Sequence, residues 1–72
     1  METIIITTEF IKLQDLLKFA SLVSTGGEAK NVIAAGEVTV NGEACAQRGR
    51  KIRPGDVVGY RGRELTVSYA DQ

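Results

Sequence analysis

The most informative segment of this 72-residue chain reads Gly36-Glu37-Val38-Thr39-Val40-Asn41-Gly42. Gly36 suits the left-handed residue that commonly follows the end of a helix. Val38-Thr39-Val40 is entirely β-branched, which favours an extended backbone. Asn41-Gly42 is a strong hairpin signal, because both residues tolerate positive φ. The segment therefore predicts the end of a helix, a strand and a tight turn, with a returning strand over residues 43–45.

Two short helices are predicted before this segment. In the first, over residues 10–20, apolar side chains recur at the i, i+3, i+4 and i+7 spacing that places them on one face: Leu13, Leu16, Leu17 and Ala20. The second ends before Gly36 and repeats the spacing with Ala29, Val32 and Ile33. Thr25 and Glu28 fit a capping box at its start. Because the link between the helices is short, we expect them to pack together.

Strands account for the rest of the chain. Residues 3–8 are all β-branched and predict a short edge strand. Residues 47–53 are expected to form a loop, and strands are predicted over 57–60 and 64–69 with tight turns before each. The order β-α-α-β-β-β-β defines an α+β fold: two short packed helices followed by a small, mostly antiparallel sheet, in a single domain of residues 1–72.

Composition excludes several classes of protein. The chain has one cysteine, Cys45, and no histidine, so it offers neither an internal disulfide nor a Cys/His zinc cluster. We expect Cys45 to be a small apolar residue in a half-buried strand. No catalytic carboxylate pattern or phosphate-binding loop occurs. We therefore expect no enzyme, metal, cofactor or small-molecule substrate, and with no membrane span or secretion signal, a cytoplasmic protein.

The charge is unevenly distributed although the formal net charge is zero. Residues 1–46 carry three bases and six acids, whereas residues 47–72 carry six bases and three acids. Four of these bases lie within residues 47–53: Arg48, Arg50, Lys51 and Arg53. Since local potential guides a polyanion to a surface, this segment is a candidate contact for nucleic-acid phosphates. Charge alone does not separate RNA from DNA, and a solvated loop is the alternative.

At residues 10–60 the chain resembles the S-four RNA-binding domain, named after a small-subunit ribosomal protein. The resemblance rests on the helix-ending glycine with its Val-x-Val-Asn-Gly hairpin, on Gly55-Asp56 before an apolar strand, and on Ser24-Thr25 with Glu28-Ala29-Lys30. Among members of this family, the chain is similar to small stand-alone bacterial versions of the domain. The resemblance implies a non-catalytic protein that binds structured RNA, ribosomal RNA in particular, in ribosome assembly.

The resemblance also implies a site formed by the two helices and the adjoining basic loop. The expected RNA-binding residues are Lys12, Gly26, Gly27, Lys30, Arg48, Arg50, Lys51 and Arg53. Two departures from the family bear on affinity: the acid of its Arg-Leu-Asp opening is Gln14 here, and Gly26 replaces an arginine. The alternative function is a protein–protein interaction module that kept the fold and lost RNA binding.

Three aromatic side chains and two arginines complete the expectations. Phe19, Tyr60 and Tyr69 are expected to pack in the core, with base stacking as the alternative for Phe19. Arg61 and Arg63 flank a predicted turn and are expected to be solvated.

Overall fold

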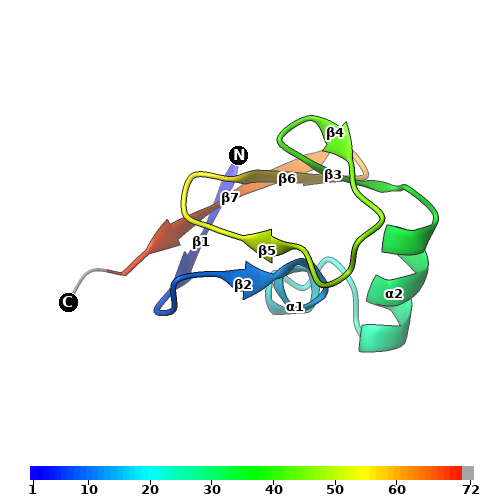
Figure 1. The fold of residues 1–72 in the computed structure, drawn as a ribbon, viewed down its shortest axis with the longest axis horizontal. Helices are drawn as coiled ribbons and strands as arrows, with labels where there is room; N and C mark the ends of the chain where they lie inside the picture. The colour runs from blue at the N-terminus through cyan, green and yellow to red at the C-terminus, as the bar shows by residue number, and fades with distance from the viewer. Residues whose placement is uncertain (71–72) are drawn as a thin grey trace.

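The computed structural model describes residues 1–70 and has two helices and seven strands within them. In chain order the elements are β1 (Glu2–Ile6), β2 (Ile11–Lys12), α1 (Leu13–Phe19), α2 (Gly26–Ala34), β3 (Val38–Val40), β4 (Glu43–Ala44), β5 (Lys51–Ile52), β6 (Val57–Tyr60) and β7 (Arg63–Tyr69). Figure 1 shows both helices below the main sheet, on one of its faces. The predicted α+β class is confirmed.

Five strands form the main sheet, in the order β1-β7-β6-β3-β4. The β1–β7 pair is parallel, and the pairs β6–β7, β3–β6 and β3–β4 are antiparallel. The sheet is thus mostly antiparallel, and β1 is an edge strand, as predicted. The predicted order was incomplete, however, because β2 and β5 form a separate two-stranded ribbon.

The first helix is shorter than its apolar spacing predicted. Residues 10–12 are not helical; Lys12 is extended, with φ −70° and ψ 144°, and occupies the cap position before Leu13. Lys12 therefore does not lie in the helix predicted over residues 10–20, which corrects that prediction. The reason is tertiary: Ile11 and Lys12 pair with β5.

The second helix begins and ends as its sequence predicts. Thr25 Oγ1 accepts a hydrogen bond from the Glu28 amide at 3.1 Å. The Glu28 carboxylate accepts one from the Ser24 amide at 2.8 Å, so the reciprocal bond of the capping box is displaced by one residue. At the other end Gly36 has φ +76°, and the Gly36 and Glu37 amides donate to the Ile33 and Val32 carbonyls. This Schellman pattern satisfies carbonyls that would otherwise lack partners.

Both predicted hairpin turns are present. Asn41 and Gly42 have φ values of 53° and 87°, which identify a type I′ turn between β3 and β4. Arg61 and Gly62, with φ values of 51° and 78°, form the turn between β6 and β7. These turns fix the register of the antiparallel strands.

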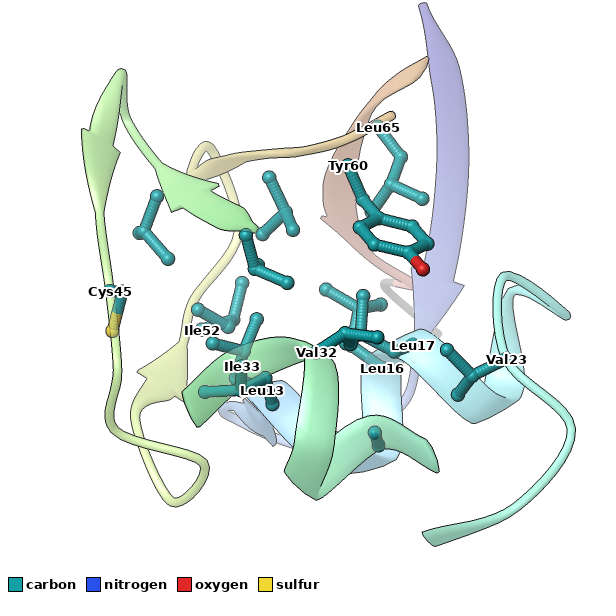
Figure 2. Packing of buried hydrophobic residues seen from close by; sticks show 14 of the residues in the cluster. Leu13, Leu16, Leu17, Val23, Val32, Ile33, Cys45, Ile52, Tyr60 and Leu65 are labelled. Carbon is teal, nitrogen blue, oxygen red and sulfur yellow. The ribbon is translucent and has the colours of Figure 1, made fainter. Parts of the chain in front are cut away.

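The core lies between the sheet and the helices. Figure 2 shows Tyr60 and Leu65 pointing from the sheet toward Leu16 and Leu17 of α1. Cys45 is a buried apolar residue with a free thiol, as expected, but it lies one residue beyond β4 and not in the predicted strand. The buried apolar residues are Ile6, Leu13, Leu16, Leu17, Val23, Ala29, Val32, Ile33, Val38, Val40, Cys45, Ile52, Val58, Tyr60, Leu65 and Val67.

Two of the three aromatic predictions were wrong. Tyr60 is buried as predicted, but Phe19 is 63% exposed and Tyr69 is 50% exposed. Phe19 is the last residue of α1 and Tyr69 the last of β7, so each lies where its element leaves the core. Neither of the two described helices is long and apolar enough to span a bilayer.

Candidate nucleic-acid interface

The β2–β5 ribbon brings together bases that are distant in sequence. Ile11 pairs with Ile52, and Lys12 pairs with Lys51. Because side chains alternate along a strand, the ribbon has an inner and an outer face. Ile52 is buried and Ile11 half-buried on the inner face, whereas Lys12 and Lys51 are exposed on the outer face. The ribbon therefore presents two lysines side by side to solvent.

Phe10 contributes an aromatic ring to this outer face. Lys51 Nζ lies 4.9 Å from the centre of the Phe10 ring, and Arg53 Cζ lies 6.0 Å from it. Both distances are within the range of a cation–π interaction. Sequence analysis missed Phe10, because its role depends on pairing between residues 11 and 52. The signal that could have found it is the matching alternation of Phe10-x-Lys12 and Lys51-x-Arg53.

The basic loop is fixed to the start of α1 by its backbone. The Leu13 amide donates to the Arg50 carbonyl at 2.9 Å, and the Gln14 amide donates to the Arg48 carbonyl at 3.1 Å. No side chain caps this helix. The loop carbonyls thus satisfy amides that a capping side chain would otherwise bind. The side chains of Arg48 and Arg50 do not make these bonds and are exposed to solvent.

Asp56 holds the turn that follows the ribbon. Its carboxylate accepts hydrogen bonds from Asn41 Nδ2 at 3.1 Å and from the Arg53 amide at 2.8 Å. Partial burial raises the pKa of Asp56, but these hydrogen bonds and the charges of Arg50 and Arg53 outweigh it, so that the pKa lies below its ordinary value of 3.8. The ionised carboxylate therefore fixes the backbone at Arg53, next to β5.

The predicted residues of α2 lie on a separate element. Gly26 and Gly27 form the first turn of α2, and Lys30 is exposed one turn later. Across residues 1–70, no hydrogen bond or ion pair joins them to the ribbon. The Glu28 carboxylate also lies at this helix start, bonded to the Ser24 amide, so a phosphate approaching Gly26 and Gly27 would meet a negative charge. The structure brings together Lys12, Arg48, Arg50, Lys51 and Arg53, but not Gly26, Gly27 and Lys30.

The two remaining arginines have partners of their own. Arg63 binds the Glu2 carboxylate through Nε and Nη2, at distances from 2.7 to 3.1 Å, and so joins β7 to β1. Arg61 lies 3.9 Å from Glu37 and 5.3 Å from the centre of the Tyr60 ring. Both side chains are exposed to solvent, as expected, and these contacts are additional to that prediction. The part of the chain that the structure describes has no other ion pairs, so none of the bases of residues 48–53 is ion-paired.

A groove of about 630 Å³ lies along α1, between this helix and the end of β1 with the residues that follow it. It is lined by Ile5, Ile6, Thr7, Thr8, Ile11, Asp15, Lys18 and Phe19. Ile5 and Phe19 are largely exposed there. The groove is lined by one acid, Asp15, and one base, Lys18, so it lacks the excess of bases found at the ribbon. Within residues 1–70 no three Cys, Asp or Glu side chains are grouped closely enough to hold a metal ion.

Comparison with known proteins identifies relatives of this chain. Residues 4–68 match the S4 domain family. The chain is 46% identical over 57 residues to the Probable ribosome maturation protein RlbA of Bacillus subtilis, and the match covers 79% of this chain and 80% of that protein.

Two solved structures share the fold. YbcJ from E. coli, whose solution structure revealed an ALFAL motif involved in RNA binding, is 32% identical with a TM-score of 0.72, and the match covers 94% of this chain and 87% of that one. The 30S ribosomal protein S4e from Thermoplasma acidophilum is 24% identical with a TM-score of 0.68, over 92% of this chain and 35% of that one.

Proposed function

Because the chain belongs to the S4 domain family, we propose that it is a non-catalytic RNA-binding protein that acts on ribosomal RNA during ribosome assembly. The similarity to a ribosome maturation protein and to an RNA-binding structure supports both parts of the proposal. The cellular location that follows from a ribosomal partner is the cytoplasm.

The observation that supports the proposal is that backbone contacts bring together the segments that carry five bases. Lys12 and Lys51 are paired across the ribbon, and the loop with Arg48 and Arg50 is hydrogen-bonded to α1. Arg53 follows within the turn that Asp56 holds. A polyanion that binds such a fixed cluster releases its own counterions without having to order the protein first. Lys30, Gly26 and Gly27 lie on α2, apart from these five bases, and are proposed as a second contact with the same RNA.

Structured RNA is the ligand class that this surface favours. Phosphate contacts and shape dominate the recognition of folded and duplex RNA, whereas single strands need aromatic platforms. In residues 1–70, the exposed aromatic rings Phe19 and Tyr69 lie outside the ribbon, and Phe10 is covered by two cations. We therefore expect affinity to depend strongly on salt and only modestly on base sequence.

The test compares two variants of equal net charge. Arg50→Glu/Lys51→Glu reverses two bases of the proposed surface, and Lys18→Glu/Arg61→Glu reverses two bases outside it. We expect the first to weaken binding of structured ribosomal RNA fragments by at least roughly tenfold at moderate salt, and to reduce the slope of log K against log salt by about 0.7–0.9 per lost phosphate contact. The second should bind like the wild type.

The measurement is a fluorescence titration at several salt concentrations, with circular dichroism to verify folding. Matched DNA duplexes in parallel titrations separate RNA from DNA binding. If both double variants lost RNA affinity equally, the loss would depend on overall charge alone, which would contradict the proposed surface. A folded wild type that binds no structured RNA at low salt would overturn the proposed function.

One observation favours the alternative of a protein-interaction module. The groove beside Phe19 exposes apolar side chains, and the formal net charge of the chain is zero. The alternative makes a different prediction for the same variants, because reversal of Arg50 and Lys51 would then leave partner binding unchanged.

A further inference from the structure

The outer face of the β2–β5 ribbon carries four side chains in a fixed arrangement. Lys12 lies opposite Lys51 in the ladder. Phe10 is two residues before Lys12 and Arg53 two residues after Lys51, so by strand alternation both belong to the same face. This placement agrees with the approach of Lys51 and Arg53 to the Phe10 ring. Two cations are thereby gathered at one aromatic ring, and a third, Lys12, lies opposite Lys51 in the ladder.

The Phe10 ring restricts the conformations of the Lys51 and Arg53 side chains. Lys51 and Arg53 have long side chains that lose considerable rotamer entropy when they bind a ligand. A ring face attracts a cation and so restricts it before the ligand arrives. Phe10 is itself half-buried, which keeps its ring in place. The ring therefore holds Lys51 and Arg53 close to each other, and Lys12 lies opposite Lys51 in the ladder.

No base on this face is ion-paired among the described residues, although the Asp56 carboxylate lies near enough to Arg53 for the two charges to interact. Like charges directly opposite each other on paired strands destabilise the pair. No carboxylate forms an ion pair with Lys12, Lys51 or Arg53 in residues 1–70, where the ion pairs are Arg61–Glu37 and Arg63–Glu2. A phosphate group has several acceptor oxygens and can bind more than one of these cations at once. The chemistry that completes this face is the phosphate backbone of a nucleic-acid strand.

We infer that Phe10, Lys12, Lys51 and Arg53 form a phosphate clamp in which Phe10 is a positioning residue that orients Lys51 and Arg53. The inference rests on the proposed RNA-binding function and specifies the part of the ligand that this face contacts. Because cations occupy the surroundings of the ring, Phe10 acts through them and does not stack on a base.

The test uses the variants Phe10→Leu and Phe10→Tyr with two polyanions. Leucine keeps an apolar side chain but removes the π-system, whereas tyrosine keeps it. We expect Phe10→Leu to weaken binding roughly three- to tenfold, the combined effect of two exposed cation–π contacts. Phe10→Tyr should bind within about twofold of the wild type. The loss should be the same for structured RNA and for inorganic polyphosphate, which has no bases.

The outcomes separate this inference from the proposed function. A loss with RNA but not with polyphosphate would identify Phe10 as a base-stacking residue and overturn the clamp. Equal losses in the leucine and tyrosine variants, or none in the leucine variant, would overturn the positioning role while RNA binding by the wild type stands. If the wild type bound polyphosphate but no structured RNA, the clamp would stand and the proposed function would fail.

Discussion

At the scale of single residues, Asn41 and Asp56 connect the two segments on which the family resemblance rests. Asn41 Nδ2 donates to Asp56, and Asn41 Oδ1 accepts a hydrogen bond from the Val57 amide at 2.9 Å. The Asn41 amide in turn donates to the Val57 carbonyl at 2.7 Å. The hairpin and the turn before β6 are thus held by one polar network, which also positions Arg53 through the other Asp56 oxygen.

Asp56 should make stability depend on pH in the acid range. Its pKa is lowered in the folded protein, so its contribution is fully present above the ordinary value of 3.8 and is lost as pH falls through the folded pKa. Asp56→Asn keeps one acceptor oxygen and should lower the free energy of unfolding at pH 7 by about 1 kcal/mol. Urea unfolding between pH 2 and pH 7 should show the difference between wild type and variant narrowing below pH 4. A difference in unfolding free energy that stayed constant across this pH range would contradict the lowered pKa of Asp56.

At the scale of elements, the β2–β5 ribbon combines a stabilising inner face with a destabilising outer one. Ile52 is fully buried, whereas Lys12 and Lys51 repel each other on the exposed side. Sites that bind ligands commonly retain such unfavourable arrangements, because removal of the charge would also remove the function. Substitutions in the ribbon that raise stability should therefore weaken the proposed RNA binding.

Lys12→Gln should raise stability while it weakens RNA binding. The variant removes the like-charge pair and should increase the free energy of unfolding by about 0.5 kcal/mol at low salt. The gain should shrink near 1 M salt, where the Debye length is only about 3 Å. Lys30→Gln makes the same chemical change on α2 and should leave stability nearly unaltered. Urea unfolding of the two variants at low and high salt measures these changes in stability. A loss of stability in Lys12→Gln would contradict the claim that Lys12 and Lys51 repel each other.

At the scale of the whole molecule, the β2–β5 ribbon, which carries the proposed RNA-binding surface, also contributes to the hydrophobic core. Ile52 belongs to the ribbon, yet its side chain lies in the same core as Leu13 of α1 and Leu65 of β7. Figure 2 shows Ile52 beside Ile33 and Leu13, below the sheet. In a domain this small, with stability of about 5–15 kcal/mol, one core position can decide whether the chain folds.

Ile52→Ala should therefore destabilise the entire fold. Deletion of these buried methyl groups should cost about 2–5 kcal/mol of unfolding free energy. The matched control is Ile5→Ala, the same change at a side chain that is 53% exposed, which should cost at most about 0.5 kcal/mol. Thermal unfolding followed by circular dichroism compares the two variants. Similar midpoints for both would show that the ribbon is not part of the cooperative core.

Several features of this protein were determined by local sequence. The Thr25 cap, the Gly36 helix end and the Asn41-Gly42 turn depend on residues no more than four or five apart, and their side chains permit few other conformations. The strands over residues 57–60 and 63–69 follow from the turns that precede them. For the same reason the α+β class, the S-four resemblance and the clustering of bases near residue 50 could be predicted.

Only the tertiary structure decided which residues meet across the ribbon. Two-residue strands have no periodicity of their own, so the pairing of Lys12 with Lys51 and the role of Phe10 could not be predicted. The exposure of Phe19 has a similar cause, because whether a residue at a helix end is covered depends on elements distant in sequence. Local propensity acts over a few residues, whereas burial and strand pairing depend on contacts between segments some forty residues apart along the chain.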